Sequence, residues 1–436
     1  MAGPTTLAIT AAVVLALAPV TDDAVRVEVD RLVGQVSAAR RLPFHGALAA
    51  RAVTRDAAEA QLSAALSARI TTSNLGVEER IFKRLGLIAG AADYTKLWAV
   101  GAASAPVATY DPAAQRLLVP DFVPLDSQRA AIIHEIAHAV ADQRFDIRQF
   151  LAPPTLLLDG DVTRARLAIV EGDATLTALE VVDPSGAFLR PTAFAALTDR
   201  LRAAAGEGRS PWLAAFGRFV HVDGLLFVAG LRARQPWAAI DAVWRDPPAS
   251  SEQILHPEKY ETCEAPIAVP ETVFPPLPGF DRPKATDVLG ELVVRTWLAT
   301  ALAPDVAARA AAGWGGDRVA VYAAPPPAPE LRADGGVVTI ARPEPPLAWL
   351  TVWDDGGEAD DFARAAASIA GEANVQRRGE AVALFFGGPE PAPDALAAML
   401  DGWKATTAAK STTKGGRPRR AAQPGCPRRD RAAAPR

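Results

Sequence analysis

The stretch Ala131-Ile132-Ile133-His134-Glu135-Ile136-Ala137-His138-Ala139-Val140 is the most informative part of this sequence. Its two histidines are four positions apart, so on a helix both imidazoles lie on one face and can reach the same metal ion. Glu135 is placed to reach a water on that ion rather than the ion itself, where it can accept a proton. We therefore predict a zinc site with His134 and His138 as ligands and Glu135 as the catalytic base.

The residues around this motif argue against a chance match. A helix that happens to carry two histidines and a glutamate is the alternative, because HExxH also occurs in unrelated proteins. Within residues 131–140, however, these three are the only charged or titratable side chains. A buried glutamate without a partner is costly, and a metal-bound water would be a suitable partner.

A catalytic zinc also needs a third protein ligand and an open fourth position. No histidine follows shortly after the motif, and His45, His221 and His256 are all distant in the sequence. Glu171 interrupts the apolar run Leu167-Ala168-Ile169-Val170 on the next predicted helix. Two adjacent antiparallel helices would bring Glu171 beside the histidine pair, so we predict it as the third ligand. An exposed helix glutamate is the alternative.

Four further polar residues are candidates for supporting roles. Asp142 and Asp173 could accept the outer N–H of a ligating imidazole in the second coordination sphere, or they could be solvated. His256 and Tyr260, in the segment His256-Pro257-Glu258-Lys259-Tyr260, could donate a hydrogen bond to a tetrahedral oxyanion, or they could be ordinary surface residues.

Apolar periodicity predicts a mainly α-helical α+β fold. A small β element should precede the HExxH helix, because two β-prone runs between Val107 and Val119 flank the turn Asp111-Pro112-Ala113-Ala114. The predicted helices cover residues 22–41, 54–68, 76–87, 127–144, 162–181, 191–205, 222–232, 236–244, 287–302 and 358–369, and the predicted later strands cover 318–322, 337–340, 348–353 and 381–386. Residues 313–317 (GWGGD) should form a turn into the first of these later strands.

Composition divides the chain into five regions. Residues 1–21 are predicted as a signal peptide or N-terminal anchor, 22–264 as a helical domain that carries the zinc site and 265–284 as a proline-rich linker. Residues 285–403 are predicted as a small α+β domain and 404–436 as a basic disordered tail.

Charge and targeting signals suggest an exported protein with an ordinary surface. The chain is 50% hydrophobic and 22% charged with a net charge of −4, so no nucleic-acid partner is expected. Residues 5–20 resemble the apolar region of a secretory signal, which predicts a periplasmic, cell-surface or secreted location. Stable membrane insertion is expected only if this stretch stays uncleaved. Cys263 and Cys426 are far apart, so no disulfide framework is expected.

In His134, Glu135, His138 and Glu171 the chain resembles gluzincin-type zinc metallopeptidases, in which a glutamate on a following helix completes HExxH. It is also similar to uncharacterised bacterial exported metallopeptidase-like proteins that have segments such as His134–Gln143, Val170–Ala174 and His256–Tyr260. The likeness covers residues 107–361. It implies a zincin-like domain, one Zn²⁺ ion and a peptide or protein substrate, which could add as a strand beside the 107–119 hairpin.

The expected activity is therefore hydrolysis of peptide bonds by a metal-activated water, with Glu135 as general base and then acid. The same residues could instead hydrolyse another amide or ester. A third hypothesis is a catalytically inactive zinc-binding scaffold or binding protein with a metallopeptidase-like fold, whose α+β domain serves in recognition. The presence of Glu135 disfavours the scaffold, because zinc binding alone does not need that residue.

Overall fold

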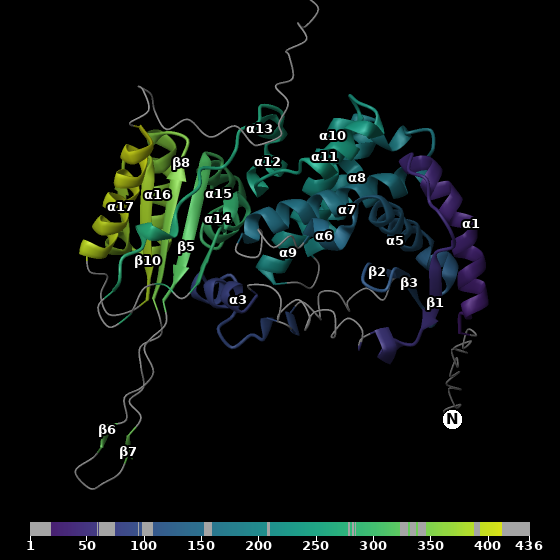
Figure 1. The fold of residues 1–436 in the computed structure, drawn as a ribbon, viewed down its shortest axis with the longest axis horizontal. Helices are drawn as coiled ribbons and strands as arrows, with labels where there is room; N and C mark the ends of the chain where they lie inside the picture. Colours follow the sequence, from purple (N-terminus) through teal and green to yellow (C-terminus); the bar gives the residue numbers. More distant parts are fainter. Residues whose placement is uncertain are drawn as a thin grey trace, which may run out of the picture.

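The computed structural model describes residues 19–58, 60, 75–94, 96–97, 108–151, 159–206, 210–277, 280, 283, 285–322, 330–331, 337–338, 346–387 and 393–411. It is a mainly helical α+β structure, with an N-terminal helical region that holds a small mixed sheet and a C-terminal α+β region built on a five-stranded antiparallel sheet (Figure 1). The fold class predicted from the sequence is thereby confirmed at this level. Nearly all of the predicted signal peptide and most of the predicted 54–68 helix lie outside the described residues.

The small sheet stands beside the first helix, α1 (Asp22–Arg40). Strand β3 (Arg116–Pro120) is central, with β1 (Ala49–Val53) parallel to it on one side and β2 (Thr109–Asp111) antiparallel on the other. The predicted hairpin is confirmed, and the Asp111 carboxylate stabilises its turn by accepting the amides of Ala113 and Ala114. Strand β1 was not predicted, because its sequence Ala-Ala-Arg-Ala-Val has little β propensity.

Two long helices form the centre of the N-terminal region. They are α5 (Leu125–Phe145), which carries the HExxH motif, and α7 (Gly160–Val182), and they pack against each other. Both predicted helices are confirmed. Helix α7 begins where the Asp159 side chain accepts the Val162 amide, and it ends at Asp183, directly before Pro184.

A third helical segment, Pro211–Arg232, packs across α7. It runs through α9 (Pro211–Arg218), the π-helical turn η3 (Phe219–Asp223) and α10 (Gly224–Arg232). The sequence prediction began this helix only at Val222. By length and composition the segment could cross a membrane, but 72% of its most apolar window is buried inside the protein. It is therefore accounted for as a core helix.

These helices approach each other closely at two glycines. A Cβ added to Gly172 of α7 would lie 2.4 Å from the carbonyl oxygen of Gly224, and a Cβ added to Gly224 would lie 2.2 Å from the carbonyl oxygen of Ala168. Backbone thus packs directly on backbone, which only residues without a side chain permit.

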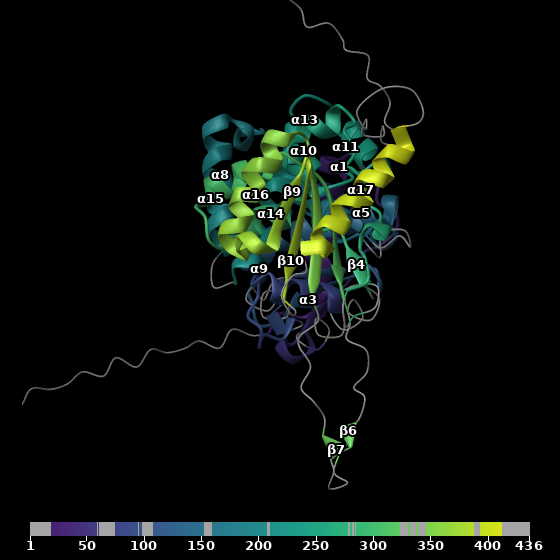
Figure 2. The same cartoon turned by 90° about the vertical axis from the view of Figure 1, so that its left-hand side faces the viewer.

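The C-terminal sheet has the strand order β4-β5-β8-β10-β9, and all its neighbours are antiparallel. Its strands are β4 (Ala285–Asp287), β5 (Trp314–Val321), β8 (Leu347–Trp353), β10 (Ala381–Phe386) and β9 (Val375–Arg378). One face packs on α14 (Gly290–Leu298), α15 (Pro304–Ala311) and α16 (Gly356–Ala370) and shares their core with the helical region. The opposite face is covered by α17 (Pro393–Ser411) (Figure 2).

The remaining elements complete the chain. They are α3 (Leu75–Arg84), α6 (Ile147–Leu151), η2 (Ala187–Leu189), α8 (Pro191–Gly206), α11 (Trp237–Arg245), α12 (Ser251–Leu255), α13 (Pro257–Glu261), η4 (Glu271–Val273), β6 (Glu330–Leu331), β7 (Val337–Val338) and η5 (Glu372–Asn374).

Several boundaries differ from the sequence prediction. The predicted turn at residues 313–317 lies mostly within strand β5, where Gly316 lets the backbone of Ile267 approach to 2.1 Å from an added Cβ. The predicted 287–302 helix is shorter, because Asp287 pairs with β5. Helix α17 continues past residue 404 to Ser411, so the predicted disordered tail begins too early. Residues 412–436 lie outside the described part of the chain.

The structure also bears on the predicted linker and on the two cysteines. The proline-rich stretch predicted as a linker contributes Val269, Val273 and Phe274 to the core beneath α17. Cys263 lies in the described part of the chain, and the expectation of no disulfide framework stays a prediction. The other cysteine, Cys426, is outside the described residues.

We expect Gly224→Ala to lower the free energy of unfolding by about 1–3 kcal/mol, because the new methyl group would collide with the backbone of α7. Gly230→Ala is the matched control on the same helix. A Cβ there meets nothing within 4 Å, so the better helix propensity of alanine should stabilise the protein by about 0.5–1 kcal/mol. Urea unfolding of both variants tests the crossing, and equal effects would contradict it.

Candidate metal centre

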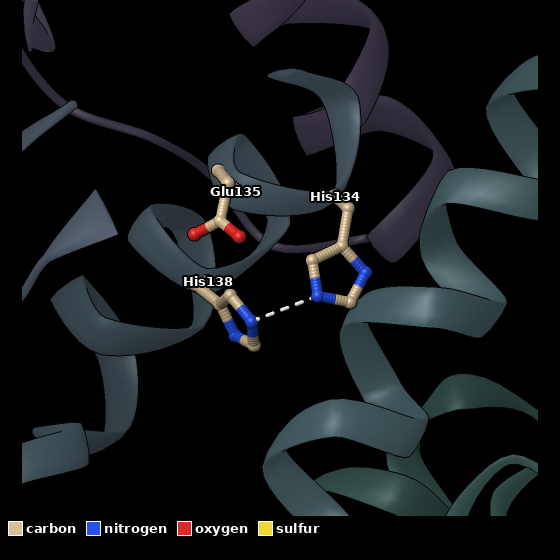
Figure 3. Close-up of side chains that lie close together, drawn as sticks. All are labelled: His134, Glu135 and His138. Carbon is tan, nitrogen blue, oxygen red and sulfur yellow. Dashed lines mark hydrogen bonds between the residues drawn. The ribbon is translucent and has the colours of Figure 1, made fainter. Parts of the chain in front are cut away.

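The histidines of the HExxH motif face each other on α5. The Nε2 atoms of His134 and His138 lie 3.0 Å apart, and Figure 3 shows the two rings with Glu135 on the same helix. These three residues form a group whose ligand atoms all lie within 4.8 Å of one another and could hold a metal ion. The helical spacing therefore brings the two imidazoles together as predicted.

Glu171 reaches this pair from α7. Its Oε2 atom lies 3.2 Å from Nε2 of His134 and 3.6 Å from Nε2 of His138. The exposed fraction of its side chain is 18%, so it is not the exposed helix glutamate of the alternative interpretation. One carboxylate oxygen and two imidazole nitrogens thus converge at a single point between α5 and α7.

Glu135 points toward the small sheet. Its Oε2 accepts the backbone amide of Tyr110 in β2, at 2.7 Å. Burial raises the pKa of Glu135, against the lowering effect of His138 and His134. The amide from β2 therefore holds the orientation of a carboxyl group whose surroundings favour proton uptake.

The electrostatics of the cluster suit a cation. Burial by itself would lower the pKa of His138, but the carboxylates of Glu171, Glu135 and Asp173, with Glu171 first among them, together outweigh it and raise that pKa to about 9. Burial has the opposite effect on Glu171 and would raise its pKa, yet His138, His134 and His221 bring that pKa well below the usual range. Glu171 is therefore held as an anion that attracts positive charge, whether this is a proton on an imidazole or a metal ion.

Asp142 and Asp173, the predicted second-sphere residues, have other partners. Asp142 accepts the Tyr110 hydroxyl at 2.8 Å and the Ile147 amide at 2.7 Å, and so joins β2 to the end of α5. Asp173 binds the Arg40 guanidinium through both oxygens, at 2.7 and 2.9 Å. Within the described part of the chain, neither carboxylate is hydrogen-bonded to a histidine of the motif.

The Arg40–Asp173 pair belongs to a buried polar network behind the site. The Arg40 side chain, which is 1% exposed, also pairs with Asp241 at 2.8 Å and lies over the ring of Trp237. The indole of Trp244 donates to Asp173 at 2.7 Å. Because Asp173 is two residues from Glu171, this network holds the segment of α7 that presents Glu171.

His256 and Tyr260, the predicted oxyanion donors, lie in the contact between the helical and α+β regions. Nε2 of His256 is 3.0 Å from the buried Glu291 carboxylate in α14, and the Tyr260 hydroxyl donates to the carbonyl of Asp246 at 2.8 Å. The structure thus gives these two residues partners other than the histidine pair.

Lys259, between them in sequence, binds Glu252, Glu264 and Asp354. Those three carboxylates are close enough together to hold a cation, and the lysine ammonium supplies one. This second acidic cluster therefore joins α12, α13 and the segment after β8.

One residue near the site escaped the sequence prediction. Nδ1 of His221, in the π-helical turn η3, lies 3.4 Å from Oε2 of Glu171. It had been set aside because it is distant from the motif in sequence. The sequence marks His221 in the same way as Glu171, because each is a single polar residue within an apolar run. The run around His221 is Phe219-Val220-His221-Val222.

Comparisons with known proteins reach only the C-terminal region. Residues 278–415 match a domain of unknown function (DUF8575). No curated protein and no solved structure matches the chain. The matched segment includes the five-stranded sheet and α17 but neither the HExxH motif nor Glu171, so it assigns no family to the candidate metal centre.

We expect Arg40→Met to lower the free energy of unfolding by about 3–5 kcal/mol, because it leaves the buried Asp173 carboxylate without its counter-ion. Arg31→Met is the matched control on α1, since Arg31 pairs with Glu28 at the surface and should change stability little. Chemical denaturation checks both variants. Similar stabilities would show that the buried pair does not hold α1 against α7.

Proposed function

We propose that this protein is a zinc metallopeptidase of the gluzincin type, with a zincin-like helical domain. The observation that carries the proposal is the convergence of His134, His138 and Glu171, next to the half-buried Glu135, which is held by a backbone amide. Two imidazoles and one carboxylate are a ligand set of known catalytic zinc sites.

The spacing of these atoms fits a metal ion. With bonds of about 2.0–2.1 Å, neighbouring ligand atoms of a tetrahedral zinc are about 3.3 Å apart. The three separations here are 3.0, 3.2 and 3.6 Å. Glu135 is also near both histidines, but its Oε2 is engaged by the Tyr110 amide. Glu171 is therefore the better third ligand, and Glu135 is left for proton transfer.

The metal ion and the residues around it would have different roles in hydrolysis. Bound zinc would supply Lewis acidity, which polarises a substrate carbonyl and acidifies a water. Glu135 would take the proton of the attacking water and return it to the leaving amine, a role that suits a carboxyl group of raised pKa. Tyr110 would keep that carboxyl group oriented through its amide and, through its hydroxyl, tie β2 to Asp142.

Export is part of the proposal. The apolar stretch at residues 5–20 would then act as the signal.

The metal content of the purified protein gives the first test. We expect one equivalent of zinc in the parent and a large loss in His138→Ala and in Glu171→Ala, because each removes a ligand atom. His45→Ala is the matched control, since His45 is exposed and should leave zinc unchanged. Elemental analysis measures all four proteins, and a parent without zinc would contradict the proposal.

Catalysis is tested by Glu135→Gln. We expect this variant to keep its zinc and to lose about 10²–10⁴-fold in hydrolysis rate, because glutamine cannot accept the proton. A library of internally quenched peptides provides the assay. A zinc-loaded parent that cleaves none of these peptides, nor amides and esters of other kinds, would favour the inactive zinc-binding scaffold.

A further inference from the structure

We propose that His221 is a fourth, exchangeable ligand of this metal site. The inference rests on the proposed function, because it concerns the same ion. It gives the site three histidines and one glutamate in place of the two histidines and one glutamate that the sequence predicts.

The first support is the position of one oxygen atom. Oε2 of Glu171 lies 3.2 Å from Nε2 of His134, 3.6 Å from Nε2 of His138 and 3.4 Å from Nδ1 of His221. All three separations are near the distance of about 3.3 Å expected between ligands that share one tetrahedral zinc. The distance from the ring nitrogen of His221 to Oε2 of Glu171 is thus similar to the distances from the two motif histidines to the same atom.

The second support is the backbone that presents His221. Residues Phe219–Asp223 form a π-helical turn inside an otherwise α-helical segment, and such turns are frequent at functional sites. Gly224 follows directly and packs on the backbone of Ala168 in α7. This backbone contact lies three residues from His221, at Gly224, and one residue from Glu171, at Gly172. It limits how far the two side chains can separate.

The third support concerns which ligand could leave. The side chain of His221 is 46% exposed, whereas those of His138 and Glu171 are 10% and 18% exposed. A hydrolytic zinc needs one position for solvent or substrate, and four permanent protein ligands would close the site. Because its side chain is the most exposed of these three, His221 can turn toward solvent with the smallest loss of packing contacts. We therefore expect His221 to leave the metal when substrate binds.

Counting the imidazoles on the metal tests this inference. We would record X-ray absorption at the zinc edge for the full-length, zinc-loaded protein without substrate, together with His221→Ala and His45→Ala. We expect three imidazoles in the parent and in His45→Ala, and two in His221→Ala. Because the parent spectrum alone separates three from two, the test stands even if His221→Ala folds poorly, which circular dichroism would reveal.

Two other results have distinct meanings. Two imidazoles in the parent, unchanged in His221→Ala, would overturn the inference and leave His221 as a hydrogen-bonding neighbour of Glu171. That result would leave the metallopeptidase proposal intact. A parent that binds no zinc at all would overturn the proposed function itself, and the inference with it.

Discussion

The backbone contact between Gly172 and Gly224 is the constraint on which the candidate site depends. It lets α7 and the Pro211–Arg232 segment approach more closely than any pair of side chains would allow. At the crossing, Glu171 comes from one helix and His221 from the other, and Glu171 contacts both His221 and the histidine pair of α5. A larger residue at either glycine would push apart the two helices that carry these side chains.

Three consecutive residues of α7 therefore contact three different helices. Glu171 faces the histidines of α5, Gly172 meets the backbone of α10, and Asp173 binds Arg40 at the end of α1. A helix directs successive side chains about 100° apart, so each of the three can meet a different element. This arrangement explains why α7 is buried on most of its circumference and why a charged pair is retained there. The Arg40–Asp173 pair is costly to bury, and its bidentate geometry with a further indole donor offsets that cost.

The C-terminal region is joined to the helical region through shared core and buried polar contacts. Asp287 of β4 accepts the amide of Gly160 in α7, and Arg164 of α7 donates to the carbonyls of Val288 and Leu289. Lys259 connects α13 with Asp354 after β8. One face of the five-stranded sheet contributes to the same hydrophobic cluster as α7 and α10. The region that matches a domain of unknown function is thus built into the structure that supports the candidate site.

Much of this structure followed from the sequence alone. The HExxH spacing placed His134 and His138 on one helix face, the 107–119 hairpin was correct, and the helices α1, α5 and α7 were found within a few residues of their ends. These features depend on local periodicity, capping and turn residues, which a single segment contains. The isolated acidic residue in an apolar run also marked Glu171, because the sequence shows which polar side chains must find a partner inside the protein.

Only the tertiary structure decided which distant segments meet. Arg40 as the partner of Asp173, the Tyr110 amide as the partner of Glu135, and His221 beside Glu171 all join residues far apart in the chain. The same holds for β1, whose weak β propensity is overridden by pairing with β3, and for Gly316, whose place in a strand depends on the approach of Ile267. Such pairings depend on how helices and strands pack, and the periodicity of one segment carries no information on which other segment will lie against it.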